Sequence, residues 1–173
     1  KYGPCDQPDY INAGLETARD IQAAVNFLTK IPESQSEHVV IIGQSAGGWG
    51  TIAYSSLPHN NVSALINMAG GRGGHKNQIK NQNCSPDSLI RAAGQFGKSE
   101  HTNMLWIYAA NDSFFDPALA KSMYEAFINS GGKAEFIQEP AFSNDGHSEF
   151  GAIGGSKIWG PAVEKYLNQQ LKL

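Results

Sequence analysis

The segment from His38 to Gly50, HVVIIGQSAGGWG, constrains the fold more than any other part of the sequence. Its first half, Val39 to Ile42, is a continuous run of β-branched residues, which favours a strand. The run ends in Gly43-Gln44-Ser45-Ala46-Gly47 and passes into residues that can propagate a helix. A strand, a tight GxSxG turn and a helix in this order predict a serine held on a strained backbone above the edge of a sheet.

This turn also gives Ser45 a chemical setting. Small residues at 43 and 47 let neighbouring chain pass without a clash against a Cβ atom. The first amides of the following helix would point at whatever the hydroxyl attacks, and the positive end of the helix favours a developing negative charge. We therefore predict that Ser45 is a nucleophile and that the amide of Ala46 is an oxyanion donor. The alternative is a glycine-rich turn with an incidental serine.

Length and charge narrow the classes of protein. The chain has 173 residues and a formal net charge of −3, without repeats or linkers, so we expect one domain over 1–173. No basic stripe is present, which argues against nucleic acid or an anionic membrane as a partner. No apolar stretch approaches the roughly 20 residues of a membrane span.

The two ends of a possible cross-link lie far apart in the sequence. Cys5 and Cys84 are the only cysteines, and no finger-like ligand spacing accompanies them, so we expect no metal site. Both lie in turn-rich segments, which favours a disulfide over a reduced pair in a cytosolic protein. The segment from Lys1 to Pro8 has neither an initiator Met nor a signal-like apolar core, and we interpret it as the interior of a longer protein. The localisation stays open.

Strand-like and helix-like segments alternate along the chain. Parallel strands joined by right-handed crossovers follow from this order, and so does a three-layer αβα sandwich with a mostly parallel sheet. The predicted helices are a segment capped by Asp9 with apolar positions Ile11, Leu15, Ala18, Ile21, Val25 and Leu28, one after Ser45 that ends before Pro58, one capped by Ser85 through Phe96, Pro117 to Asn129, and Gly160 to Leu171. The predicted strands are Val39 to Ile42, Ser63 to Ala69, Asn103 to Ala110 and Ala134 to Gln138, the last nearer an edge. The polar segment from Gly70 to Asn83 is expected to be mobile.

Three chemically complementary side chains follow three of these strands. Ser45 follows the first, Asp112 the third and His147 the fourth, so all three belong to the rim where the carboxyl ends of parallel strands meet. A serine hydroxyl needs a base within hydrogen-bond reach, and a carboxylate fixes the tautomer of the imidazole. We predict that Ser45, His147 and Asp112 have these roles.

The competing histidines and acids are weighed by position. His38, His59 and His101 fall on the opposite rim and are interpreted as solvated loop residues, whereas His75 lies on the correct rim and is a candidate substrate contact. Among the acids, Asp116 precedes Pro117 and is better explained as a helix cap. Asp145, two residues before the histidine, is poorly placed to orient it. Glu149 is interpreted as a loop charge.

With these residues in hand, the chain resembles the α/β-hydrolase superfamily, and within it the dienelactone-hydrolase-like and prolyl-oligopeptidase-like serine hydrolases. Gly43 to Gly48 is similar to their nucleophile elbow, Asp112 to the acid after their penultimate strand, and His147 to their late histidine loop. The resemblance implies that the strands here are the last four of an eight-stranded sheet. It covers nearly all of this chain but only the second half of the family's fold, so the fold class is an α/β-hydrolase fold without its N-terminal strands.

The sequence departs from the pattern of this family at two points, and the missing strands have one consequence for the sheet. Dienelactone hydrolases proper have cysteine where this chain has Ser45, which argues against a lactone-specific role. The family's second oxyanion donor comes from a loop that would lie before Lys1. Without the preceding strands, Val39 to Ile42 would present an unpaired apolar edge. We expect upstream sequence, another chain or self-pairing to cover this edge.

The function predicted from these observations is a serine hydrolase that cleaves a carboxylic ester or a related acyl bond and needs no cofactor. Its partner would be a small acyl substrate, with Gln44, Trp49, Phe114 and Phe115 as candidate substrate-binding residues. The alternative role for these three aromatic side chains is packing in the core. A non-catalytic module that keeps the fold is the rival from another class, and a serine peptidase or acyltransferase is the rival among enzymes.

Overall fold

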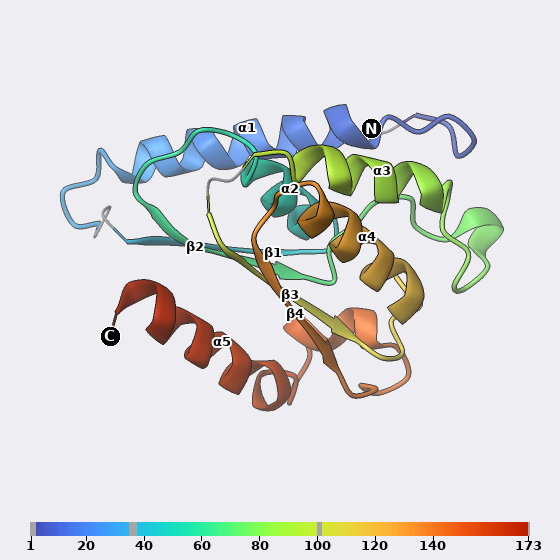
Figure 1. Cartoon of the computed structure of the whole chain (residues 1–173). Helices are drawn as coiled ribbons and strands as arrows, with labels where there is room; N and C mark the ends of the chain where they lie inside the picture. The colour runs from blue at the N-terminus through green and yellow to red at the C-terminus, as the bar shows by residue number, and fades with distance from the viewer. Residues whose placement is uncertain (1–2, 35–37, 100–101, 173) are drawn as a thin grey trace.

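The computed structural model describes residues 3–34, 38–99 and 102–172 (Figure 1). Helices and strands alternate as the sequence predicts. They are α1 (Tyr10–Leu28), β1 (Val39–Gln44), α2 (Ala46–Tyr54), β2 (Val62–Met68), the 3-10 helix η1 (Lys76–Gln78), α3 (Pro86–Phe96), β3 (Met104–Ala109), α4 (Pro117–Asn129), β4 (Ala134–Glu139), the 3-10 helix η2 (Gly146–Gly151) and α5 (Ser156–Leu171).

The four strands form one parallel sheet in the order β1-β2-β3-β4. Helices α1 to α4 cover one face of this sheet and α5 covers the other (Figure 1). The predicted three-layer α/β architecture is therefore confirmed. Because every strand runs in the same direction, the segments after β1, β3 and β4 all leave the sheet at one rim.

Each face of the sheet has its own apolar core. The face under α1 to α4 is rich in aromatic side chains, with Trp49 and Trp106 fully buried. The opposite face is smaller, and Val163 and Tyr166 of α5 pack there against β2 and β3. Strand β3 supplies side chains to both clusters, and all six of its residues are buried. This strand is thus the centre of the core.

Helix α1 faces the core along most of the predicted stripe, because Ala18 and Val25 are buried and Leu15 and Ile21 pack against the core cluster. Asp9 caps the helix as expected, because its Oδ1 accepts the amide of Asn12 at 3.0 Å. Ile11 and Leu28, however, are each 39% exposed. The buried face also includes Tyr10, and the Trp49 Nε1 donates to its carbonyl at 2.9 Å. Small residues on α1 permit this close approach to α2, and only the two ends of the predicted apolar stripe are exposed among its described positions.

One glycine fixes the distance between α1 and α2. A Cβ atom on Gly50 would lie 2.3 Å from Cγ2 of Thr17 and 2.8 Å from its Cβ. Real Cβ atoms do not approach this closely, so only glycine lets α1 pack against the helix that follows Ser45.

The disulfide favoured by the sequence is present. Cys5 and Cys84 are bonded at 2.07 Å and enclose 79 positions of sequence separation. Close by, the Tyr10 hydroxyl donates to the carbonyl of Cys84. The bond ties the segment before α1 to the segment before α3, and loops of this length are expected to stabilise by about 4 kcal/mol through the entropy of the unfolded chain.

Several local predictions differ from the structure. Helix α5 begins at Ser156 rather than Gly160, because Pro161 lies inside the helix instead of opening it. Ser85 occupies the cap position of α3 but accepts no backbone amide there, since its Oγ pairs with that of Ser88 at 2.8 Å. The segment from 70 to 83 is irregular apart from η1, and its mobility stays a prediction. No helix in the described ranges is long and apolar enough to cross a membrane.

The interpretation of Glu149 as a loop charge is wrong. Its side chain lies in η2 and the residue is only 5% exposed, with an Oε1 that accepts no hydrogen bond. Burial, with a smaller contribution from Glu139, raises the pKa of Glu149 to about 7. Burial disfavours the charged form of a carboxyl group because the protein solvates it less well than water does.

We expect Gly50→Ala to lower the free energy of unfolding by about 1–3 kcal/mol, since the added methyl group overpacks the contact with Thr17. Gly47→Ala in the same helix is the matched control, because a Cβ there meets nothing within 4 Å. Urea denaturation of both variants measures the difference. Equal stability of the two variants would contradict the close contact between α1 and α2.

Glu149→Gln tests the buried carboxyl. Between the ordinary value of 4.5 and about 7, the folded protein holds a proton on Glu149 that the unfolded chain has released. Stability from this group is therefore complete below pH 4.5 and lost as the pH rises through 7. At pH 8 the Gln variant should exceed the wild type by up to about 3 kcal/mol in urea denaturation, with little excess near pH 4.5. The exposed Glu164→Gln is the control; an excess that is independent of pH would refute the assignment.

Candidate active site

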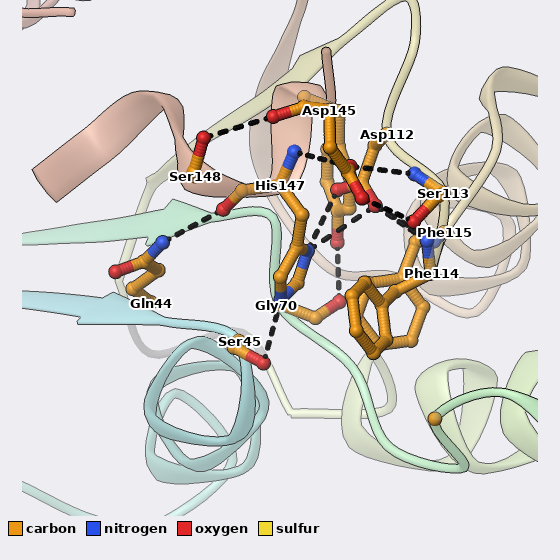
Figure 2. A network of polar contacts seen from close by, with 12 residues as sticks. Gln44, Ser45, Gly70, Asp112, Ser113, Phe114, Phe115, Asp145, His147 and Ser148 are labelled. Atoms are coloured by element: carbon orange, nitrogen blue, oxygen red, sulfur yellow. Dashed lines mark hydrogen bonds and ion pairs between the residues drawn. The ribbon is translucent and has the colours of Figure 1, made fainter. Parts of the chain in front are cut away.

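The three side chains selected from the sequence meet at the rim after β1, β3 and β4. The Ser45 Oγ lies 3.0 Å from the Nε2 of His147. On the other side of the imidazole, Nδ1 lies 3.0 Å from Oδ2 and 3.2 Å from Oδ1 of Asp112. Figure 2 shows the resulting line from hydroxyl to imidazole to carboxylate, built from three separate loops. His147 therefore lies within hydrogen-bond distance of both Ser45 and Asp112.

The backbone of Ser45 is strained, as the motif predicts. Its φ of 53° and ψ of −119° lie in a region that residues with a Cβ rarely adopt. The amide of Ser45 donates to the carbonyl of Met68 at 3.0 Å, and the Ser45 carbonyl accepts from Gly71 at 3.1 Å and Trp49 at 3.0 Å. These three bonds to β2, the loop after it and α2 hold the strained turn in place.

The two glycines of the motif are not equivalent. A Cβ on Gly43 would lie 2.3 Å from the carbonyl oxygen of Gly47, so the strand and the helix can approach only without a side chain there. A Cβ on Gly47 would meet nothing within 4 Å. The predicted steric need for small residues on both sides of Ser45 thus holds for Gly43, whereas Gly47 faces open space among the described residues.

Asp112 is held in one orientation by its own loop. It is 2% exposed, and its Oδ1 accepts the amides of Phe114 at 2.8 Å and Phe115 at 3.0 Å. A buried carboxylate requires such partners, because its desolvation is costly. The hydrogen bonds turn the carboxylate toward His147. The competing acid Asp116 caps α4 as predicted, accepting the amides of Ala118 and Leu119.

Two polar residues hold the backbone of His147. The Gln44 Nε2 donates to the His147 carbonyl at 2.8 Å. The Asp145 Oδ1 accepts the amide of His147 at 3.1 Å and that of Ser113 at 3.1 Å. Burial opposes ionisation of Asp145, but the hydrogen bonds from Ser113 and His147 outweigh it and lower the pKa of the carboxyl. Asp145 does not contact the imidazole, in agreement with its rejection as the orienting acid.

A buried network below the site escaped sequence reasoning. The Tyr108 hydroxyl donates to the carbonyl of Gly70 at 2.6 Å and accepts from Nδ2 of Asn67 at 3.0 Å. Burial raises the pKa of Tyr108, so the hydroxyl stays protonated. The network fixes the loop after β2, whose Gly71 amide donates to Ser45. A polar residue within an apolar strand, such as Asn67 in VSALINM, was the available signal.

A pocket of about 210 Å³ opens beside Ser45, between the glycine-rich loop after β2 and two aromatic side chains. Its lining comprises Ser45, Ala46, Gly71, Arg72, Gly73, Gly74, Phe114 and Phe115. Phe114 and Phe115 thus lie where the prediction placed them, although contact with a substrate stays a prediction. The same prediction for Trp49 is wrong, because this side chain is fully buried and packs edge-on against Phe96 with centroids 5.3 Å apart.

The remaining histidines agree only in part with the interpretation from the sequence. His75 stacks on Phe114 with ring centroids 3.8 Å apart, and its Nε2 lies 2.8 Å from the carbonyl of Ser113. His59, on the opposite rim, contacts Thr102 and Tyr54 and is therefore half-buried rather than solvated. His38 is exposed, and His101 lies outside the described residues. In the described part of the chain, no cluster of three or more His, Cys, Asp or Glu side chains could hold a metal ion.

The arrangement is chemically competent for acyl transfer. An imidazole lies between a hydroxyl and a buried carboxylate, and the hydroxyl sits at the N-terminus of α2. The amide of Ala46, the first residue of that helix, belongs to the orphan donors of a helix end. Such donors stabilise negative charge that develops beside a helix N-terminus.

Solved structures share this fold at low sequence identity. A candidate dienelactone hydrolase from Klebsiella pneumoniae is 16% identical with a TM-score of 0.61, and the alignment covers 89% of this chain and 60% of that one. An esterase from Pyrococcus furiosus is 14% identical (TM-score 0.62; 91% and 63% covered), and a puromycin-hydrolysing peptidase from Mycobacterium tuberculosis is 15% identical (TM-score 0.56; 85% and 26% covered). The chain therefore spans about 60% of the length of the first of these relatives.

Sequence comparison identifies the family. No curated protein matched the chain. The family model described as "Dienelactone hydrolase family" matches residues 12–155, which include Ser45, Asp112 and His147. This match spans most of the described fold, from α1 to the segment before α5. The chain belongs to the dienelactone hydrolase family.

Proposed function

We propose that this protein is a serine hydrolase that cleaves a carboxylic ester or a related acyl bond. The observation that carries the proposal is the continuous contact from Ser45 Oγ through His147 to Asp112, with both key distances at 3.0 Å. Membership of a family named for a lactone hydrolase supports ester chemistry. The presence of serine rather than cysteine at position 45 favours an ester over a lactone-specific role.

The reaction begins with the Ser45 hydroxyl. As its oxygen attacks the carbonyl carbon of the substrate, the Nε2 of His147 accepts the proton. Asp112 keeps the proton of the imidazole on Nδ1, so that Nε2 is free to act as the base, and stabilises the imidazolium that forms. The charge that develops on the carbonyl oxygen is stabilised by the Ala46 amide and the N-terminus of α2.

The second half of the reaction reverses these roles. His147 returns the proton to the leaving alcohol, and the acyl group stays on Ser45 as an ester. Water then attacks this acyl-enzyme while His147 accepts a proton from it, and His147 donates that proton to the Ser45 oxygen as the bond to the acyl group breaks, which releases the acid and restores the hydroxyl. The pocket between Gly71 and Phe114 is the proposed site for part of the substrate.

Ser45→Ala and His147→Ala should each lower turnover of p-nitrophenyl acetate by at least about 10³-fold. The double variant should lose little more than either single variant, because the two groups act in one step. Ser56→Ala and His38→Ala are the matched controls, since Ser56 bonds only to its own helix and His38 lies exposed on the opposite rim. Steady-state kinetics on purified protein measure the effects.

The outcomes separate the rival functions. Full ester hydrolysis by Ser45→Ala would end the proposal. A wild-type protein without turnover of esters, amides or acyl-transfer substrates would favour a non-catalytic module. Preferential cleavage of a peptide amide, or transfer of the acyl group to an alcohol in place of water, would redirect the same triad to a peptidase or an acyltransferase.

The free edge of β1 bears on the partners of the protein. Within the described residues β1 pairs only with β2, and Ile42 on this strand is 40% exposed. Unpaired apolar edges associate readily with another strand. We propose that a further strand, from upstream sequence, another chain or a second copy, pairs with β1 in the working protein.

Hydrogen exchange tests this pairing. In the native protein, all amides of Val40 to Ile42 should exchange slowly, because those that face away from β2 bond to the added strand. Amides of Ile107, in a central strand, provide the reference for protection. Rapid exchange of alternate β1 amides, with slow exchange of Ile107, would contradict the pairing.

A further inference from the structure

We infer that Gln44 and Asp145 are positioning residues that hold the backbone of His147 in register with Ser45 and Asp112. This inference rests on the proposed serine hydrolase function. Gln44 donates a hydrogen bond to the carbonyl of His147, and Asp145 accepts one from its amide. Gln44 directly precedes Ser45, and Asp145 also bonds to Ser113, which directly follows Asp112.

The hydrogen bond from Gln44 connects the loop of His147 to the turn that carries Ser45. Gln44 is the last residue of β1 and directly precedes Ser45. Its Nε2 donates to the carbonyl of His147 at 2.8 Å across a sequence separation of 103. Figure 2 shows the Gln44 side chain reaching from the strand to the histidine loop. The bond therefore fixes the height of this loop relative to the turn that carries Ser45.

The hydrogen bonds of Asp145 connect the loop of His147 to the loop that carries Asp112. Asp145 Oδ1 accepts the amides of His147 and of Ser113, each at 3.1 Å, while Oδ2 accepts the hydroxyl of Ser113. Ser113 directly follows Asp112 and is only 5% exposed. One carboxylate thus joins the loop after β3 to the loop after β4. The Asp145 carboxylate makes no contact with the imidazole in doing so.

The location of His147 in a short 3-10 helix explains why these hydrogen bonds are needed to position its imidazole. His147 lies in η2, a short 3-10 helix that follows the edge strand β4. Short 3-10 segments have poor hydrogen-bond geometry and little stability of their own. The imidazole must nevertheless reach Ser45 and Asp112 at the same time, both at 3.0 Å. Displacements of about 1 Å in a catalytic group can cost about 100-fold in rate.

Packing restrains the imidazole ring on one side. The imidazole lies beside Phe114 and Phe115, with centroid distances of 4.3 and 5.6 Å. These contacts restrict the ring from the side of the aromatic wall. Movement of the loop along the rim, toward or away from Ser45, is opposed by the hydrogen bonds of Gln44 and Asp145. These hydrogen bonds therefore add to the restraint of the histidine loop, in which the Gly146 amide also donates to the carbonyl of Asn111 at 3.2 Å.

The test uses Gln44→Leu and Asp145→Ala, which remove the side-chain hydrogen bonds to the His147 backbone and leave the three triad side chains unchanged. Each should lower kcat for p-nitrophenyl acetate by about 10-fold to 100-fold while KM changes less than about 3-fold, because a lost hydrogen bond to a positioned group is worth that factor. The rate of fluorophosphonate labelling should fall in parallel. Gln138→Leu, at an exposed site of β4, and Asp9→Ala, at the cap of α1, are the controls and should keep full kcat.

A conservative variant separates positioning from general stability. Asp145→Asn keeps an oxygen that can accept the amides of Ser113 and His147, so its kcat should lie within about 5-fold of the wild type. Thermal unfolding of every variant identifies changes that only destabilise the fold. If Gln44→Leu and Asp145→Ala both keep wild-type kcat and labelling rates while Ser45→Ala is inactive, the inference is wrong and the hydrolase function stands. If Ser45→Ala is fully active, the proposed function itself fails.

Discussion

The parallel direction of all four strands is the constraint on which the rest of this structure depends. It brings the ends of β1, β3 and β4 to one rim, although Ser45 and His147 are separated by 102 positions in the sequence. The sheet sets the distances between strands, and the loops supply chemistry at points that the sheet has already fixed.

Convergence is maintained at a local energetic cost. Ser45 has a strained backbone, and Asp112 buries a carboxylate at the rim. Backbone hydrogen bonds offset both costs, since Met68 and Gly71 hold the serine while Phe114 and Phe115 donate to the acid. Strain and buried charge of this kind concentrate at functional sites because the surrounding fold is rigid enough to maintain them.

Much of the site followed from the sequence because its signals are local. The GxSxG turn after a β-branched run located Ser45, and the order of the strands placed Asp112 and His147 on the same rim. Asp145 and Gln44 were not identified as supports of His147, because their partners lie in other loops and no pattern reveals the pairing. An Asp two residues before another residue often bonds to that residue's amide, which was the signal that was available for Asp145.

The errors of sequence reasoning share a physical cause. Trp49 and Ile11 are both apolar residues whose exposure depends on which helix packs where, and periodicity does not specify that neighbour. Glu149 was assigned to solvent because charged residues are seldom buried, yet the turn of η2 encloses it. Helical period thus located α1 and most of its buried face, whereas Ile11 and Leu28 at the two ends of the stripe are exposed.

The central claim is that Ser45 is an activated nucleophile, and peptide mapping after reaction with a fluorophosphonate tests it most directly. Mass spectrometry of the digested protein should locate a single adduct on the peptide that contains Ser45. Prior incubation with an ester substrate should slow its formation. An unlabelled protein, or an adduct spread over several surface serines at equal rates, would contradict the account.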